Sequence, residues 1–369
     1  MVIDTYLLVN MPGDSAIIDR LSTGWREYLG VETPRPTSFP VSLSAALPFL
    51  NPLGQTLPQA SPASGGFPGS DIEQTIEQHL DAHGIDRALV CHDRCRTISA
   101  LPDPRLCLDA VSACNDWMRE VVLPADDRLY GTLILPAQSP SESARAIRAA
   151  ANDPKWAAVM ISTNSLGRPL GHPSYHPIYE AAAEVGFPVI VDAAIDTPLE
   201  VSTPATSAAP TTYTDLYALS SQSLSTHLVS MVGQAVFELW PTLTVFMVGA
   251  GVAWVTPLLW RFDSNYKAFR RDAPRLTRLP SEYFMDHVRI GTYPLDRFDE
   301  PDELADYLLA EPRLQDVLCY ASGYPGWDRN TPADVERALP DEWVGNALAA
   351  NAANAFRWPA PASIPAATA

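Results

Sequence analysis

Three side chains near the ends of predicted strands have the chemistry for acid–base catalysis. Asp192 ends an apolar run of β-forming residues, Tyr6 lies in the first such run, and His92 follows another. A carboxylate at the end of a buried strand is desolvated, which disfavours its ionised form and suits it to proton transfer. A phenol can donate a hydrogen bond or a proton to the same ligand. We therefore predict general acid–base chemistry by Asp192, Tyr6 and His92, with a buried but inert polar cluster as the alternative.

Four further residues are candidates for binding a small molecule. Arg94 follows His92 closely and suits a substrate carboxylate. Asn164 ends a strand and offers an amide, and Trp254 follows a glycine turn and could stack on an aromatic ring. His172 lies in the loop GHPSYHPIYE, where a structural cap is the alternative to a ligand contact.

These residues must be positioned by an alternating chain of strands and helices. The predicted strands are 2–9, 88–91, 129–135, 156–161, 188–192, 243–248, 288–292 and 317–320. Strict alternation with helical segments predicts a parallel sheet, and eight such units in 369 residues favour an α/β fold of the closed (β/α)₈ TIM-barrel type. The carboxyl ends of the strands then meet at one mouth, where we expect the candidate residues to converge.

Three segments interrupt this regular pattern. Residues 33–69, rich in Pro, Ser and Gly, form a long insertion after the first strand, and 193–215 form a second one; both are candidate lids. Residues 359–369 read as a disordered Pro/Ala tail. The remainder, 1–358, is predicted to be a single domain.

Charge and cysteine content exclude several classes of partner. A net charge of −18 opposes binding to nucleic acid and to anionic membranes. The five cysteines include no Cys-x-x-Cys pair, and no secretory signal is visible at the N-terminus. We therefore expect a cytoplasmic protein with reduced thiols.

Four stretches resemble the amidohydrolase-related family, which includes aminocarboxymuconate-semialdehyde decarboxylase and the hydroxybenzoate decarboxylases. They are RLYGTLILPAQSPSESARAIRAAANDPKWAAVMI, PLGHPSYHPIYEAAAEVGFPVIV, FELWPTLTVFMVGAGVAWVTPLLWRFD and CYASGYPGWD. The resemblance runs from about residue 2 to residue 356. It implies an amidohydrolase-like barrel, often dimeric, which acts on aromatic or carboxylated small molecules by C–C cleavage or hydrolysis. It also implies a divalent metal, usually zinc, at the mouth.

The metal ligands of that family are mostly missing from this sequence. The family's ligand positions fall on Tyr6, Leu8, Asp192, Gly249, Gly323 and Gly326. Only Asp192 carries a strong donor, whereas a protein zinc site typically has about four ligands. His79 and His83 have a zinc-compatible spacing, but a solvated helix face without a third ligand is the favoured interpretation. We therefore predict no metal and no cofactor.

Two functions remain open on these grounds. The first is a metal-independent lyase, hydrolase or cyclase that acts on a small aromatic or carboxylated metabolite. The second is a catalytically inactive relative that binds a ligand or serves as the partner subunit of a metal-competent paralogue. The expected assembly is a homodimer or a heteromer with such a paralogous subunit.

Overall fold

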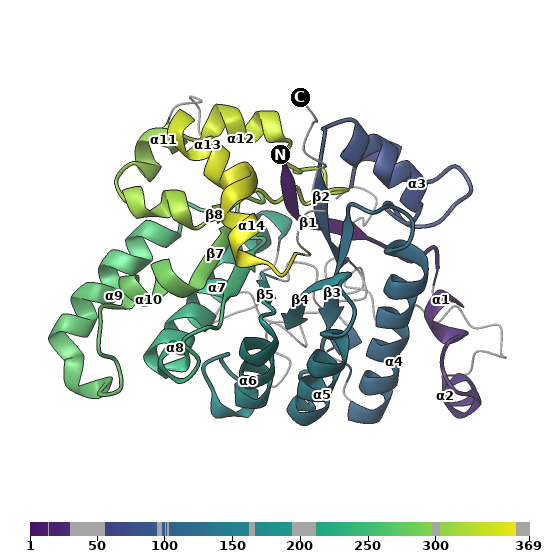
Figure 1. Cartoon of the computed structure of the whole chain (residues 1–369), viewed down its shortest axis with the longest axis horizontal. Helices are drawn as coiled ribbons and strands as arrows, with labels where there is room; N and C mark the ends of the chain where they lie inside the picture. Colours follow the sequence, from purple (N-terminus) through teal and green to yellow (C-terminus); the bar gives the residue numbers. More distant parts are fainter. Residues whose placement is uncertain are drawn as a thin grey trace, which may run out of the picture.

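The computed structural model describes residues 1–13, 15–29, 56–93, 98–99, 101, 103–161, 167–193, 212–296 and 303–358. Its strands are β1 (Ile3–Val9), β2 (Arg87–His92), β3 (Leu129–Ile134), β4 (Trp156–Ile161), β5 (Val189–Asp192), β6 (Val245–Val248), β7 (Val288–Gly291) and β8 (Leu318–Cys319). They form one eight-stranded sheet in sequential order, and every neighbouring pair is parallel. The predicted (β/α)₈ barrel is confirmed (Figure 1).

Backbone hydrogen bonds between β1 and the chain after β8 close the sheet into a barrel. The amide of Thr5 donates to the carbonyl of Tyr320 at 2.9 Å. The amide of Gly323 donates to the carbonyl of Tyr6 at 3.0 Å. Because β8 has only two residues, the chain that follows it makes the contacts with β1 that close the barrel.

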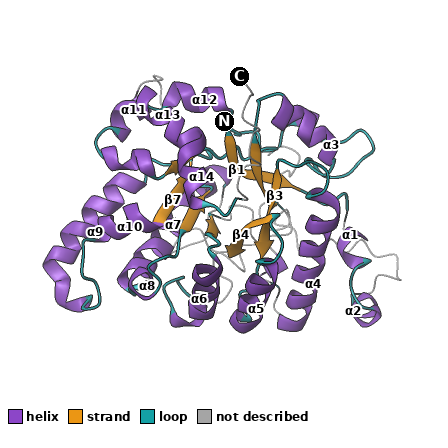
Figure 2. Ribbon diagram, in the orientation of Figure 1, coloured by secondary structure: helices purple, strands orange, loops and turns teal. Residues whose placement is uncertain are grey.

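Helices surround the barrel (Figure 2). They are α1 (Ser15–Ile18), α2 (Thr23–Tyr28), α3 (Ile72–Thr75), α4 (Pro104–Trp117), α5 (Pro140–Ala150), α6 (His176–Val185), α7 (Tyr213–Gly233), α8 (Val236–Leu239), α9 (Val255–Phe269), α10 (Pro280–His287), α11 (Glu303–Leu308), α12 (Pro332–Ala338), α13 (Asp341–Gly345) and α14 (Asn351–Ala355). In the described part of the chain, none of them is long and apolar enough to cross a membrane.

Alternation along the strands divides the core into two clusters. Leu89 and Cys91 of β2 belong to the inner cluster, which fills the barrel, whereas Val90 packs outward with the helices. Phe356, just after α14, belongs to the inner cluster and packs edge-on against Phe246, with ring centroids 5.3 Å apart. Strand β2 therefore contributes to two separate apolar layers.

Local capping differs from the sequence pattern in two places. The pattern Ser70-Asp71-Ile72-Glu73 suggests a cap at its first residue, but Asp71 is the N-cap of α3 and accepts a hydrogen bond from the Gln74 amide. Helix α7 begins at Tyr213, inside the predicted insertion 193–215, because Thr212 and Asp215 form a capping box. The insertion residues 30–55 and 194–211 and the tail 359–369 lie outside the described residues.

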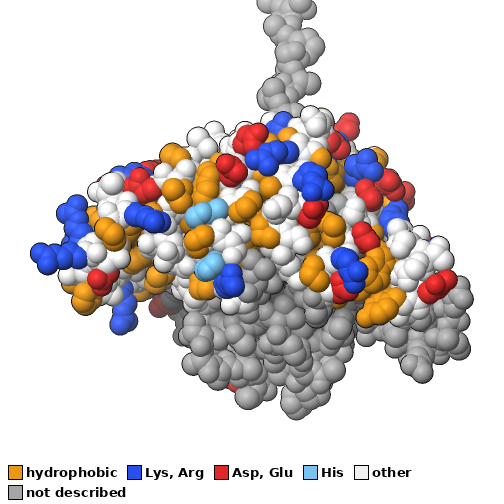
Figure 3. Space-filling view, turned by 90° about the horizontal axis from the view of Figure 1, so that it is seen from below, with side chains coloured by type: hydrophobic (Ala, Val, Ile, Leu, Met, Phe, Trp, Pro, Cys, Tyr) orange, Lys and Arg blue, Asp and Glu red, His pale blue; other side chains and the backbone are white. Residues whose placement is uncertain are grey.

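The face of the molecule in Figure 3 intersperses acidic, basic and hydrophobic side chains over its described part. Basic side chains do not merge there into one continuous patch. This distribution, together with the net charge of −18, offers no basic stripe on that face to neutralise phosphates.

Candidate functional site

A phenol–carboxylate pair spans the barrel from the middle of β1 to the carboxyl end of β5. The Tyr6 hydroxyl, from β1, donates a hydrogen bond to Asp192 Oδ2, from the end of β5. Tyr6 is 1% exposed and Asp192 is 4% exposed. Because β1 and β5 stand on opposite sides of the eight-stranded ring, this bond lies across the barrel. The structure thus brings together two of the three residues predicted to do acid–base chemistry.

A second phenol–carboxylate pair stands beside the first. Tyr293 follows β7, and its hydroxyl donates to Asp328 Oδ1 at 2.9 Å. The Tyr293 and Tyr6 rings lie 5.9 Å apart, centroid to centroid. Burial, followed by the negative charge of Asp328, raises the pKa of Tyr293 well above its usual range. The phenol therefore remains a hydrogen-bond donor at neutral pH.

Sequence reasoning did not identify this second pair. The available signal was the position of Tyr293 just beyond the seventh predicted strand, the same type of position that singled out Asp192. Asp328 carried no such signal, because it follows the last strand by several residues and reaches Tyr293 only through the folded loop.

The glycines at the family's ligand positions leave space that the two pairs occupy. A Cβ on Gly249 would lie 2.9 Å from Asp192 Oδ1. A Cβ on Gly323 would lie 2.1 Å from a carbon of the Tyr293 ring, and one on Gly326 would lie 2.9 Å from Asp328 Oδ1. Any side chain at these glycines would therefore displace a member of one of the pairs.

The family's ligand positions, in the part of the chain that the structure describes, do not assemble a metal site. Tyr6 occupies one Asp192 oxygen, Leu8 is aliphatic and packs in the inner core cluster, and the glycines supply no donor atom. Among the described residues, no group of three or more His, Cys, Asp or Glu side chains is arranged to hold a metal ion. A zinc site needs about four converging donors, so these positions do not supply one.

His92 lies on the other face of the barrel wall. Its neighbour Cys91 points into the barrel, so His92 points outward, and its ring lies 5.7 Å from the ring of Trp117 on α4. The expectation that His92 reaches Asp192 is therefore wrong, because the two-residue period of a strand turns it away from the mouth. His92 is 1% exposed, and neither of its ring nitrogens has a hydrogen-bond partner among the described residues.

The predicted ligand-binding residues are distributed differently. Arg94 and Asn164 lie outside the described residues. The Trp254 indole donates to the Gly251 carbonyl at 2.9 Å and packs against the outer core. His172 Nδ1 accepts a hydrogen bond from the Ser174 amide at 3.1 Å and so caps a short 3₁₀ turn.

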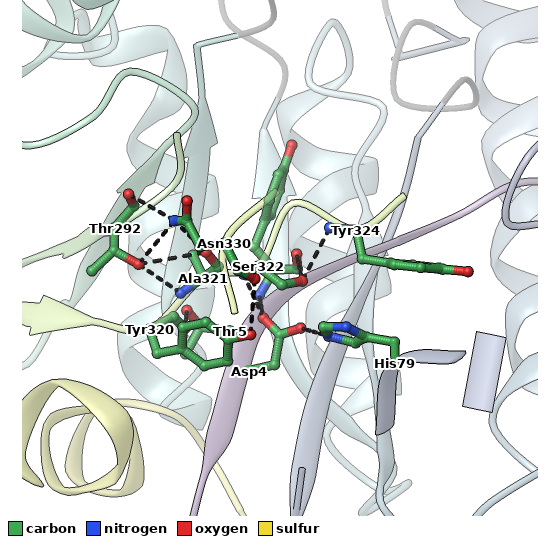
Figure 4. A network of polar contacts seen from close by, with 10 residues as sticks. Asp4, Thr5, His79, Thr292, Tyr320, Ala321, Ser322, Tyr324 and Asn330 are labelled. Atoms are coloured by element: carbon green, nitrogen blue, oxygen red, sulfur yellow. Dashed lines mark hydrogen bonds and ion pairs between the residues drawn. The ribbon is translucent and has the colours of Figure 1, made fainter. Parts of the chain in front are cut away.

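A buried hydrogen bond between His79 and Asp4 (Figure 4) supports the backbone at Tyr6. His79 Nε2 lies 2.8 Å from Asp4 Oδ2, and both side chains are fully buried. Asp4 Oδ1 accepts hydrogen bonds from the amides of Tyr6 at 3.0 Å and Ser322 at 2.9 Å. His79 is thus a core residue, and the interpretation of His79 as part of a solvated helix face is wrong.

Asn330 similarly supports the chain around Tyr293 (Figure 4). Its amide nitrogen donates to the carbonyls of Thr292 at 3.0 Å and Ala321 at 3.2 Å. The amide of Leu295 donates to its oxygen at 3.2 Å. One side chain therefore joins the β7 loop to the β8 loop on either side of the second pair.

Comparisons with known proteins agree with this architecture. A family profile described as amidohydrolase matches residues 108–358. A comparison with curated proteins found no match.

Among solved structures, 5-carboxyvanillate decarboxylase from Sphingomonas paucimobilis shares 19% identity at a TM-score of 0.67, covering 97% of this chain and 99% of that one. The 2,6-dihydroxybenzoate decarboxylase from Rhizobium shares 15% identity at a TM-score of 0.65, covering 96% of this chain and 97% of that one. An amidohydrolase from Mycobacterium avium subsp. paratuberculosis K-10 shares 16% identity at a TM-score of 0.71, covering 96% of this chain and 98% of that one. At these identities the likeness shows the shared fold.

Proposed function

Since the chain belongs to the amidohydrolase family, we propose that it is a metal-independent acid–base enzyme that acts on a small aromatic or carboxylated molecule. The observation that carries this proposal is the hydrogen bond between Tyr6 and Asp192 across the barrel. A phenol and a carboxylate that share a proton-bearing contact in a buried place can take up and release a proton without solvent reorganisation.

The names of two solved structures with the same fold support an aromatic acid as the substrate class. Both are named as decarboxylases of hydroxylated or methoxylated aromatic acids. A ring hydroxyl supplies the electron sink that such a decarboxylation needs, so proton delivery is the main demand on the protein. We therefore place a hydroxylated aromatic acid first among the candidate substrates.

The proposed reaction uses Asp192 as the proton donor. Asp192 delivers a proton to the ring carbon that bears the carboxylate, Tyr6 orients Asp192 through its hydroxyl, and the C–C bond breaks to release carbon dioxide. The bonding electrons return to the ring, and Asp192 regains its proton from solvent. General acid–base catalysis of this type contributes about 10²–10⁴-fold to a rate.

Two substitutions test this proposal. Wild-type protein dialysed against EDTA is screened for carbon dioxide release from a panel of hydroxybenzoates, and we expect turnover to survive removal of metal. Asp192→Asn is expected to lower kcat by at least about a hundredfold, because it removes the transferable proton. Tyr6→Phe is expected to lower kcat by about tenfold or more, since the hydrogen bond from Tyr6 to Asp192 is lost.

Matched controls separate chemistry from folding. Tyr324→Phe removes a hydroxyl that bonds Gln78, away from the Tyr6–Asp192 contact, and it should leave kcat unchanged. Circular dichroism and thermal unfolding check that every variant is folded. Full activity of Asp192→Asn, or activity that depends on stoichiometric zinc, would end the proposal.

The packing of the mouth favours one alternative. Leu8 is 6% exposed and packs in the inner cluster with Tyr6, which leaves little of either side chain open. A catalytically silent subunit that pairs with a metal-competent paralogue would need no open mouth. Native mass spectrometry of the chain with such a paralogue distinguishes the two: a stable heteromer from a chain without turnover supports this alternative.

A further inference from the structure

We propose that Tyr293 and Asp328 form a second catalytic pair that contacts the same substrate as Tyr6 and Asp192. The inference rests on the proposed function, and it assigns two residues that the sequence did not single out. Its basis is the juxtaposition of two phenol–carboxylate pairs, with Tyr6 and Tyr293 ring centroids 5.9 Å apart.

The two pairs occupy space that side chains at the ligand positions would need. Asp192 Oδ1 lies where a Cβ on Gly249 would come within 2.9 Å, and the Tyr293 ring lies where a Cβ on Gly323 would come within 2.1 Å. A ligand side chain at either glycine is thus sterically incompatible with the pair beside it. The two pairs therefore depend on glycine at these two positions.

Exposure distinguishes the two pairs. Tyr6 and Asp192 are almost fully buried, whereas Tyr293 keeps part of its surface accessible. The Tyr293 hydroxyl lies at hydrogen-bond distance from a buried carboxylate, Asp328. In this proposal a ligand in the mouth contacts the partly accessible Tyr293 ring. This arrangement can pass a proton from a ligand hydroxyl through the phenol to Asp328.

The step balances within the proposed decarboxylation. As Asp192 protonates the ring carbon, the substrate hydroxyl gives its proton to the Tyr293 oxygen, and Tyr293 gives its own proton to Asp328. The ring becomes a dienone that still bears the carboxylate. When the C–C bond breaks and carbon dioxide leaves, the electron pair restores the aromatic ring, and the proton returns from Asp328 through Tyr293 to the product oxygen.

Two variants and a matched pair of substrates test the inference. Tyr293→Phe keeps the ring over Gly323 and removes only the hydroxyl, and Asp328→Asn keeps the shape and removes the proton acceptor. With a hydroxybenzoate that the wild-type enzyme turns over, both are expected to lower kcat by about 10²-fold or more with little change in KM. Tyr324→Phe, from the same loop, should match wild type.

The second substrate replaces the ring hydroxyl by a methoxy group, which has no proton to pass on. Wild type is expected to lose most of its rate with this substrate, whereas Tyr293→Phe and Asp328→Asn should barely distinguish the two substrates. A purely structural role would instead lower the rate with both substrates by the same factor. That equal loss would overturn the inference.

Failure of this inference can be told apart from failure of the proposed function. If Asp192→Asn is inactive while Tyr293→Phe and Asp328→Asn retain wild-type rates, only the second pair is rejected. If Asp192→Asn and Tyr6→Phe are fully active, or wild type turns over no member of the panel, the proposed function is rejected and this inference with it. Should Tyr293→Phe fail to fold, Asp328→Asn alone decides.

Discussion

At the scale of single residues, Gly323 leaves the space that the Tyr293 ring occupies. Gly323 has a φ of +67°, and the Tyr293 ring lies against the position of its missing Cβ. Both features require glycine, the first because other residues are strained at positive φ and the second because a methyl group would overlap the ring. Glycine at position 323 is therefore required for the observed position of the Tyr293 ring.

Gly323→Ala should be more destabilising than an equivalent change elsewhere. Gly186 ends α6 at a φ of +74°, and beyond the adjacent backbone no heavy atom of the described residues lies within 4 Å of its missing Cβ. Gly186→Ala should cost only the conformational strain, about 1–2 kcal/mol of unfolding free energy. Gly323→Ala should cost about 1–3 kcal/mol more, because the ring must move. Urea denaturation of both variants measures the difference, and equal losses would show that Tyr293 does not press on Gly323.

At the scale of elements, a carboxylate joins the loop after β7 to the turn between β6 and α9. Asp296 accepts hydrogen bonds from the amides of Val252 at 2.6 Å and Ala253 at 3.0 Å. Burial raises the pKa of Asp296, and these amide bonds partly oppose that rise. The glycine turn after β6 and the β7 loop, which carries Tyr293, are thus held together by one side chain.

Asp296→Ala is expected to destabilise the protein by about 1–3 kcal/mol, because it leaves two backbone amides without their acceptor. Asp296→Asn keeps an acceptor oxygen and avoids a buried charge, so its stability at neutral pH should lie near that of wild type. Chemical denaturation at pH 7 provides the comparison. Similar stabilities for the Ala and Asn variants would argue against this role of the carboxylate.

The elements themselves were largely predictable from the sequence. Runs such as 156–161 and 188–192 are apolar and short, so their strands follow from local composition alone, and the structure places them within a residue or two. The start of helix α7 lies inside the segment 193–215 that was predicted to be an insertion, because it depends on the capping residues Thr212 and Asp215. Capping residues are a weaker signal for the start of a helix in a sequence than hydrophobic periodicity is for the helix itself.

At the scale of the whole molecule, buried histidines connect separate layers. His227 on α7 accepts a hydrogen bond at Nδ1 from the Leu170 amide, at 3.2 Å, and so joins the helix to the segment after β4. Burial lowers the pKa of His227 from 6.5 to about 4. The folded protein therefore keeps this ring neutral, as its acceptor role requires.

This pKa shift predicts an acid-sensitive stability. Above pH 6.5 the ring is neutral in both states, and as the pH falls from 6.5 toward 4 only the unfolded chain takes up the proton. Stability should therefore decline over that range by about 3 kcal/mol from this group. His227→Gln cannot titrate and should have a flatter profile in denaturation measured at several pH values. An unchanged slope in the variant would contradict the assignment.

The sequence by itself determined the barrel, its strand order and the identity of the residues at the family's ligand positions, because periodicity and residue type are properties of the chain taken locally. Only the tertiary structure decided which side chains meet. Tyr6 and Asp192 are 186 residues apart, and their contact depends on the closure of the ring. His92 turned outward and His79 turned inward to Asp4, since the face that a strand or helix residue presents is fixed by packing. The pairing of Tyr293 with Asp328 likewise arises from two loops that come together only after the barrel closes.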